Sequence, residues 1–278
     1  MVSLILDPLS LSVVPIELIF RSTIIGQATG FFYLTELDGR PQIALVTNWH
    51  VLSGRNADNP CLTLHKKGAT PDSIRITTIA KSSDLTRGQM TVLHYDFPMY
   101  EDDGRARWLQ HPLKNDIDIA LAFVNDNVSG AKIEPVNVVA DAYDMKIEVG
   151  NDVYILGYPL GYRHFAHTPI WKRGTIASEP NYDIEGSDAG KRVLIDATTR
   201  SAMSGSPVIM RQKTHYLSAE GSIVQKANAT RFIGVYAQRP KLKGEGSESA
   251  ELGYFFRSGH IDEIIKAVER GPNHGELP

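Results

Sequence analysis

Short apolar or alternating runs, separated by turn residues, recur along this chain and constrain its fold more than any other feature. Runs of this length match β-strands, and many short strands between frequent turns are typical of a barrel or a sandwich. The predicted fold class is therefore all-β. The runs are Ile16–Phe20, Gly30–Leu34, Ile43–Thr47, Ile117–Val124, Asp152–Leu156, Val193–Ala197, Val208–Met210 and Phe232–Ala237.

One segment near the C-terminus has a helical pattern instead. Its apolar residues Ile261, Ile264, Ile265 and Val268 follow the spacing i, i+3, i+4, i+7, which places them on one helical face. Ser258 can cap the start, and the Gly-Pro pair at 271–272 ends the pattern. The sequence predicts a short C-terminal helix over about residues 259–270.

Charge and composition exclude several classes of partner. The 278 residues carry 29 Lys and Arg against 32 Asp and Glu, a net charge of −3, so no basic field favours nucleic acid. No stretch approaches the roughly 20 apolar residues that span a bilayer. Asp7 and two prolines precede the first basic residue, Arg21, which is unlike a secretory signal. We expect a cytoplasmic protein with no nucleic-acid or membrane partner.

A single cysteine, Cys61, cannot form an internal disulfide, which agrees with a reducing compartment. In Cys-Leu-Thr-Leu-His, residues 61–65, Cys61 and His65 would share a strand face, and a lone buried thiol is the expected state of this cysteine. His164 and His167 have the spacing of a helical metal pair, but Gly161 and Pro169 favour a loop. We predict no metal and no cofactor.

Three segments carry the residue types of nucleophilic catalysis. A serine hydroxyl needs an imidazole base and a third group that fixes the imidazole tautomer. His50 follows an apolar strand, Asp118 opens another, and Ser204 lies in a turn of small residues. Each feature alone is ordinary structural chemistry, but the order His, Asp, Ser matches the chymotrypsin template. Asp116 is a competing orienter, and Asp118 is preferred because Ile-Ala-Leu follows it directly.

The sequence resembles the trypsin-like (chymotrypsin-fold) serine peptidases, and within them the bacterial Deg/Htr-type and glutamyl-endopeptidase-like branches. Its T-x-x-H-V, D-I-A-L and S-G-S-P-V boxes contain His50, Asp118 and Ser204 in turn, and the resemblance runs from about Ala28 to Val268. Strand-like segments also resemble the Deg/Htr branch. These segments are Ile155–Gly161, Arg173–Ser178 and Gly253–Ser258.

The resemblance implies a fold of two six-stranded antiparallel β-barrels with the C-terminal helix, all in one peptidase domain over residues 1–278. The first lobe would cover about residues 12–140 and the second about 145–258, with no PDZ module after them. His50 and Asp118 would belong to the first lobe and Ser204 to the second.

The resemblance also implies roles. Ser204 would be the nucleophile, His50 the general base and Asp118 its orienter, with the oxyanion hole formed by the N–H groups of Ala202 and Ser204. The family usually has glycine where this chain has Ala202. Alanine in a left-handed conformation costs about 1–2 kcal/mol, which handicaps the hole without excluding it.

Substrate contacts implied by the resemblance are Thr198 and Thr199 at the base of the primary pocket, Tyr236 on its wall, and Ala237 and Gln238 on the edge strand that pairs with substrate. No carboxylate lies there, which favours small or medium uncharged side chains before the scissile bond.

The predicted function is a serine endopeptidase that hydrolyses polypeptides through an acyl-enzyme on Ser204. Met203 replaces the aspartate that switches on digestive zymogens, so control would come from loops or from a regulatory protein partner. The alternative is a pseudo-peptidase, a module of the same fold that holds a peptide or a partner protein without cleavage.

Overall fold

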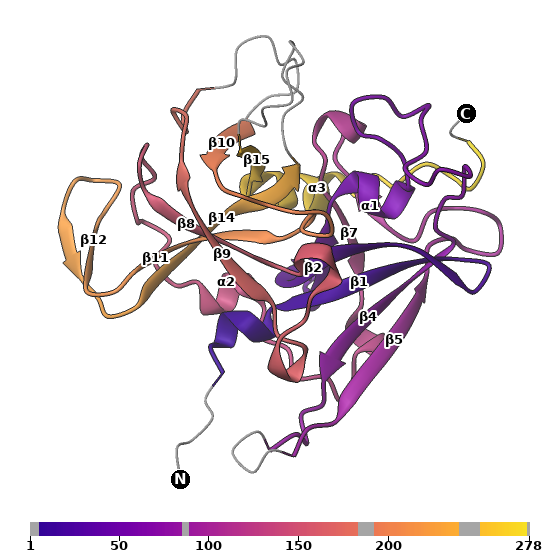
Figure 1. Cartoon of the computed structure of the whole chain (residues 1–278), viewed down its shortest axis with the longest axis horizontal. Coiled ribbons are helices and arrows are strands. Elements are labelled where there is room, and N and C mark those ends of the chain that lie inside the picture. Colours follow the sequence, from indigo (N-terminus) through magenta and orange to yellow (C-terminus); the bar gives the residue numbers. More distant parts are fainter. Residues whose placement is uncertain (1–5, 85–88, 183–191, 239–250, 277–278) are drawn as a thin grey trace.

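The computed structural model describes residues 6–84, 89–182, 192–238 and 251–276. Strands dominate it and form two lobes that lie side by side (Figure 1). The predicted mostly-β class and the short C-terminal helix are both confirmed.

The first lobe is a seven-stranded antiparallel sheet in the order β5-β4-β1-β2-β3-β7-β6. Pro15 of β1 has no N–H to donate. It lies opposite Thr29 of β2, and β1 pairs with β4 only from the next residue onward, so the β1–β4 ladder is not interrupted. The strands are β1 Val13–Phe20, β2 Thr23–Leu37, β3 Arg40–Thr47, β4 Ser73–Ile79, β5 Val92–Pro98, β6 Leu109–Gln110 and β7 Ala120–Phe123.

This sheet corrects the prediction of a six-stranded barrel in the first lobe. β5 and β6, the two edge strands, do not pair with each other in the described sheet. The segments that follow β5 and precede β6 meet at an isolated bridge between Tyr100 and Ala106, where the Arg107 N–H donates to the Met99 carbonyl at 2.9 Å. The chain between Tyr100 and Ala106 contains a turn, with the Gly104 N–H bonded to the Glu101 carbonyl at 2.9 Å. β6 is also only two residues long, and Arg270 pairs with its Leu109. The ladder therefore stays open where a barrel would close.

The second lobe is the closed barrel that the sequence predicts, with the strand order β10-β15-β14-β11-β8-β9. Alternating burial along β8 and β10 reflects side chains that point alternately into and out of the barrel. A separate hairpin of β12 and β13 projects from it (Figure 1). The strands are β8 Asp152–Gly157, β9 Ile170–Ile176, β10 Arg192–Asp196, β11 Pro207–Gln212, β12 His215–Leu217, β13 Ile223–Gln225, β14 Ala229–Gln238 and β15 Leu252–Arg257.

Helices are short and connect or cover the sheets. They are α1 Trp49–Ser53, α2 Val136–Val139 and α3 Gly259–Ala267, with 3-10 turns η1 Pro8–Leu11, η3 Lys114–Asp116, η4 Asn125–Asn127, η5 Pro159–Gly161 and η6 Phe165–His167. α3 buries Ile261, Ile264 and Ile265, three residues of its predicted apolar face. The fourth, Val268, was predicted wrongly: the helix ends at Ala267, and Val268 caps it in a left-handed conformation and is exposed.

One buried cluster joins the lobes. It contains Phe31 and Val46 from the first sheet, Leu156 and Val235 from the second barrel, and Ile264 from α3. Because both lobes contribute apolar side chains to the same core, the cleft between them has a fixed geometry.

Each end of the described chain packs on the lobe that is remote in sequence. Near the N-terminus, the Asp7 carboxylate accepts a hydrogen bond from Arg211 of β11 at 2.6 Å. Near the C-terminus, the Gly271 N–H donates to the carbonyl of Trp108 in the first lobe at 2.9 Å. A Cβ on Gly271 would meet the Trp108 ring at 2.5 Å, so this approach requires glycine.

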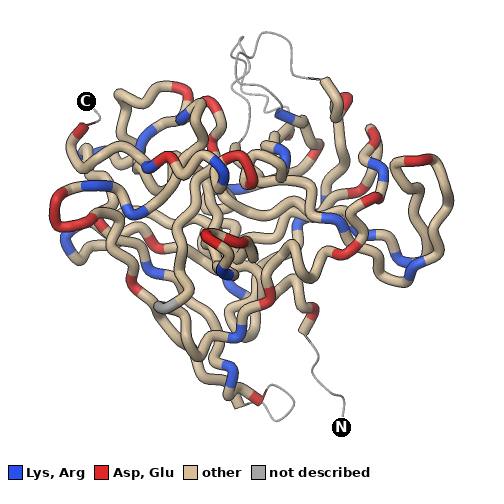
Figure 2. The backbone as a smooth tube through the Cα atoms, turned by 180° about the vertical axis from the view of Figure 1, so that it is seen from behind, with Lys and Arg blue, Asp and Glu red and all other residues tan. Residues whose placement is uncertain are grey.

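Charged residues of both signs alternate over the view in Figure 2. Among the described residues, no helix has the length and apolar character needed to cross a membrane.

Candidate active site

The Asp118 carboxylate holds His50 by two hydrogen bonds. His50 lies in α1, directly after β3, and its backbone N–H and its Nδ1 lie 2.9 and 2.7 Å from the two Asp118 oxygens. The Asp118 side chain is only 2% exposed. A buried carboxylate at Nδ1 keeps the proton on that nitrogen, which leaves Nε2 able to accept a proton.

Asp118 points at α1 because the chain turns tightly there. The Ile119 N–H donates to the Ile117 carbonyl at 2.6 Å, which places Asp118 at the centre of a three-residue turn just before β7. The Asn48 side chain donates to the Asp118 carbonyl at 2.6 Å and ties this turn to the start of α1. Asp116, the competing orienter, lies in η3, and no hydrogen bond joins it to His50 in the described structure.

Ser204 lies on a tight turn between the lobes. The Ser206 N–H donates to the Met203 carbonyl at 3.1 Å, and Gly205 inside the turn has a φ of 85°. A Cβ on Gly205 would lie 2.2 Å from the Thr29 carbonyl oxygen, so only glycine fits. The Thr29 N–H donates to the Ser204 carbonyl at 2.9 Å and anchors the turn to the first lobe.

Ala202 lies in the left-handed region that its position was expected to require, with a φ of 69°. Two hydrogen bonds hold the strained segment. The Leu160 N–H donates to the Ser201 carbonyl at 2.8 Å, and the Thr29 hydroxyl donates to the Ala202 carbonyl at 2.8 Å. Because a peptide unit is planar and trans, fixing the Ser201 carbonyl also fixes the Ala202 N–H in the opposite direction. Among the described residues, neither the Ala202 N–H nor the Ser204 N–H has a hydrogen-bond partner. Two free donors are therefore held around the serine.

The Ser204 hydroxyl does not bond to His50 in this structure. It donates instead to the Ala237 carbonyl at 3.0 Å. His50 and Ser204 nevertheless line the same cavity. The structure thus brings Ser204 and the His50–Asp118 pair to one cleft, without a hydrogen bond between the serine hydroxyl and the imidazole.

A cavity of about 440 Å³ opens on one side of Ser204 and contains most of the predicted substrate contacts. Its wall is tied together by a 2.5 Å hydrogen bond between the hydroxyls of Thr199 and Tyr236. Thr198, which was expected beside Thr199, is exposed and does not line this cavity. The lining residues are Thr199, Arg200, Ser201, Ser204, Tyr236, Ala237 and Gln238.

Gln238 is fixed at the edge of this cavity. Its side-chain amide donates to the Tyr254 hydroxyl at 2.9 Å. Burial raises the pKa of the Tyr254 hydroxyl, and the negative charge of Asp118 raises it further. Tyr254 therefore stays neutral near the His50–Asp118 pair.

A second cavity, of about 710 Å³, opens on the His50 side of Ser204. Sequence reasoning missed three of its lining residues, His65, Lys66 and Lys67. The alternation in residues 61–65 predicted a strand with a buried Cys61, but the segment is a loop and Cys61 is exposed. The two adjacent lysines at 66 and 67 were the feature of the sequence that could have indicated a binding surface here.

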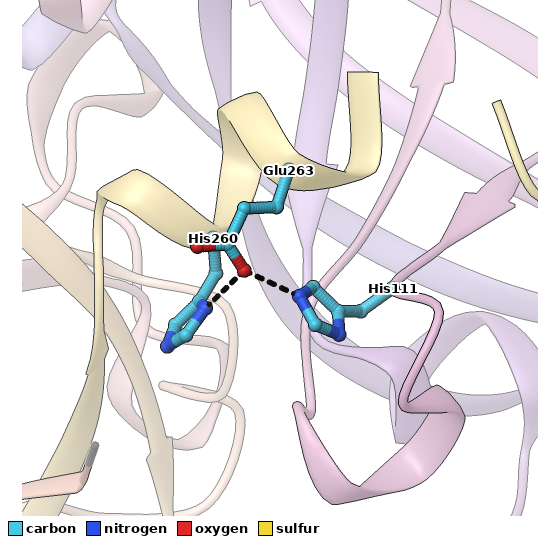
Figure 3. Close-up of side chains that lie close together, drawn as sticks. All are labelled: His111, His260 and Glu263. Carbon is cyan, nitrogen blue, oxygen red and sulfur yellow. Dashed lines mark hydrogen bonds and ion pairs between the residues drawn. The ribbon is translucent and has the colours of Figure 1, made fainter. Parts of the chain in front are cut away.

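A second cluster of histidine and carboxylate lies outside the cleft. Glu263 of α3 accepts hydrogen bonds from His111, which follows β6, at 2.7 Å and from His260 at 3.0 Å (Figure 3). Their ligand atoms lie within 4.8 Å of one another, so the group could hold a metal by distance. His164 and His167 are not part of it.

The hydrogen bonding of His111 favours a tie between elements over a metal site. The Leu113 N–H donates to His111 Nδ1 at 3.1 Å, so the ring proton lies on Nε2. Coordination through Nε2 would move that proton to Nδ1, against the Leu113 N–H. Hydrogen bonding from His111, and then from His260, holds the pKa of the Glu263 carboxyl below its usual value.

The chain matches the trypsin-like peptidase domain over residues 28–214. It therefore belongs to the trypsin-like peptidase family, which confirms the resemblance seen in the sequence. Family membership indicates a serine peptidase that acts on polypeptides.

Solved structures similar to the chain include three proteases. The Rv3671c protease from M. tuberculosis in its active form is 16% identical with a TM-score of 0.48, over 97% of this chain and 84% of that chain. Deg5 is 17% identical with a TM-score of 0.47, over 94% and 88%. The HtrA-type protease AlgW with a tripeptide is 13% identical with a TM-score of 0.46, over 93% and 60%. A comparison with curated proteins gave no match.

Proposed function

We propose that this protein is a serine endopeptidase that hydrolyses peptide bonds through an acyl-enzyme on Ser204. The observation that carries the proposal is the buried Asp118 carboxylate on His50 Nδ1, beside a cavity that Ser204 also lines. This arrangement leaves Nε2 of the His50 imidazole able to accept a proton beside the cavity that Ser204 also lines.

In the proposed reaction, Ser204 Oγ attacks the carbonyl carbon of the substrate while His50 Nε2 takes the hydroxyl proton. The oxyanion that forms accepts hydrogen bonds from the free N–H groups of Ala202 and Ser204. His50 then gives its proton to the leaving amine, and the C–N bond breaks. Water then attacks the acyl carbon while His50 Nε2 takes one of its protons. His50 returns this proton to Ser204 Oγ as the ester bond breaks.

Substrate binding would also move the serine hydroxyl. The Ala237 carbonyl that holds Ser204 Oγ lies near the end of β14, beyond the pairing of this strand with β11, which reaches only to Val235. A substrate backbone N–H would pair with it there. Once that N–H occupies the carbonyl, the hydroxyl is free to turn to His50. The resting hydrogen bond is therefore compatible with activity on bound substrate.

The rival proposal is a pseudo-peptidase that holds a peptide or protein partner without cleavage. The hydrogen bond between Ser204 and the Ala237 carbonyl favours it, because the nucleophile is turned away from its base.

Labelling by a fluorophosphonate separates the two proposals. We expect Ser204 in the wild type to react, and Ser204→Ala or His50→Ala to abolish labelling, because nucleophile and base act as a unit. Ser222→Ala changes an exposed serine of the β12–β13 connection and should label like the wild type. A wild type that remains unlabelled, with and without peptide, would support the binding module.

A further inference from the structure

The large cavity beside His50 has an apolar interior. Leu18 and Ile25 contribute to it from β1 and β2, Val51 from α1, and Leu64 from the loop after α1. Its volume of about 710 Å³ lies within the range of roughly 300–1,000 Å³ that holds drug-sized ligands. This space exceeds the needs of one side chain.

The position of His50 identifies which half of a substrate would enter the large cavity. His50 lines the large cavity and is absent from the lining of the small one. As the general acid, His50 must reach the leaving amine. On the proposed function, on which this inference rests, the residues after the scissile bond therefore lie in the large cavity.

The loop over this cavity carries unpaired positive charge. Lys66 and Lys67 line it, and neither forms an ion pair with any described residue. By contrast, Lys146 and Lys226 of the second lobe pair with carboxylates at 2.7 and 2.9 Å. No acidic residue is among the lining residues of the large cavity.

His65 adds an unsatisfied polar group to the same wall. Its Nδ1 is buried and has no hydrogen-bond partner within the described chain. The loop itself is held in place, because the Leu64 N–H donates to the Gly54 carbonyl and the Gly68 N–H donates to the His65 carbonyl, both at 2.9 Å.

We propose that this cavity selects the leaving half of the polypeptide, with an apolar side chain in its interior and a carboxylate at Lys66 and Lys67. The apolar wall would bury the side chain, and the two unpaired ammonium groups would bind the negative charge. The carboxylate comes either from an Asp or Glu side chain or from the C-terminus of the substrate, since both present the same group.

Four matched peptides test the proposal. All share one acyl half and a Leu-Leu leaving half. Two continue past Leu-Leu with Glu or with Gln, and two stop there with a free carboxylate or with an amide. We expect kcat/KM to be about threefold higher for the carboxylate member of at least one pair, a typical gain for an exposed ion pair. The pair that shows it identifies the source of the carboxylate.

The double variant Lys66→Gln/Lys67→Gln should lose this preference, so that the two members of each pair are cleaved with kcat/KM values within about twofold of each other. Lys146→Gln/Lys226→Gln removes the same net charge from the second lobe and should keep the preference. Salt at about 0.5 M should reduce the preference in the wild type, because it screens exposed charges. Equal kcat/KM within both pairs, or a preference that survives the Lys66 and Lys67 changes, would overturn the proposal.

A binding assay keeps this inference separate from the proposed function. Fluorescein-labelled leaving halves, titrated into Ser204→Ala protein, should bind several-fold tighter as carboxylates than as amides. If the wild type cleaves nothing but this difference holds, the proposed function fails and the carboxylate site stands. If the carboxylates and the amides bind with equal affinity and fluorophosphonate labelling is normal, the carboxylate site fails and the proposed function stands.

Discussion

Two groups among the described residues pair histidine with a carboxylate at 2.7 Å, and they differ in what surrounds the pair. Asp118 is 2% exposed and serves one imidazole, and His50 borders the cavity that contains Ser204. Glu263 is 52% exposed and is shared by His111 and His260.

The difference shows that the pair alone does not define a catalytic group. In the cleft, a buried carboxylate fixes the proton on His50 Nδ1 and the other ring nitrogen adjoins a nucleophile. At α3, the His111 ring uses one nitrogen for Glu263 and the other for the Leu113 N–H, so it has no site left for a substrate proton. We interpret the His50–Asp118 pair as part of the candidate active site and the His111–His260–Glu263 group as a structural contact between α3 and the first lobe.

Changing each carboxylate to its amide gives the largest expected contrast. Asp118→Asn should lower kcat/KM by about 10⁴-fold, because the amide favours the wrong imidazole tautomer. Glu263→Gln should change kcat/KM by less than about twofold, since surface pairs contribute little. Steady-state cleavage of one peptide by both variants checks this.

Asp116→Asn is the matched control for the first change, because Asp116 lies two residues away and makes no hydrogen bond to His50 in the described structure. It should retain near wild-type activity. If Asp116→Asn and Asp118→Asn were equally impaired, the assignment of the orienter would be wrong.

Relief of strain at Ala202 should have an intermediate effect that is confined to the cleft. Ala202→Gly removes a left-handed alanine, whose cost of about 1–2 kcal/mol corresponds to roughly 5- to 30-fold in the population of the open turn. We expect kcat/KM to rise toward that range, because the N–H donor acts mainly on the transition state.

Steady-state cleavage of one peptide by the wild type and by Ala202→Gly measures this expected rise in kcat/KM. Equal kcat/KM values would mean that the bonds from Leu160 and Thr29 already hold the alanine turn fully. A lower value for the glycine variant would show that the oxyanion donors lie elsewhere.

The smallest effect concerns stability and belongs to Glu263. Its folded-state pKa is lowered, so its contribution to stability is present above the unfolded value of 4.5 and is lost as pH falls through the folded value. Because the side chain is half-exposed, we expect Glu263→Gln to lower the free energy of unfolding by under about 1 kcal/mol at pH 7.

Urea unfolding of wild type and Glu263→Gln at pH 7 and at about pH 3.5 measures this difference, which should shrink in acid. A difference that grows in acid would contradict the hydrogen-bonded tie. Zn²⁺ provides a second check. If Zn²⁺ stabilises the wild type but not Glu263→Gln, the cluster binds metal and the interpretation as a hydrogen-bonded tie is wrong.

Sequence patterns predicted the helix and eight of the described strands because each pattern is local, although the run predicted from Ile117 becomes a strand only at Ala120. The i, i+3, i+4, i+7 spacing from Ile261 describes one helical face whatever it packs against. The open edge of the first sheet depends on Arg270 meeting Leu109, a contact between segments 161 residues apart, which no local pattern reports.

The cavity loop was missed for a related reason. Alternation in residues 61–65 matches a strand, but a strand needs a partner, and this segment has only the isolated bridge from Thr63 to Arg55. Cys61 is consequently exposed, and Lys66 and Lys67 lie over the cavity. The meeting of His111 with Glu263 likewise spans 152 residues and could not be read from spacing.

The crossed packing of the two chain ends has a consequence for the order of folding. Asp7 contacts Arg211 in the second lobe, and Gly271 contacts Trp108 in the first, so neither lobe is complete without the remote end of the chain. Contacts this far apart in sequence form late and slowly. We therefore expect the cleft between the lobes to assemble late in folding, so that a protein with the proposed activity would acquire its complete cleft only once its own chain has folded.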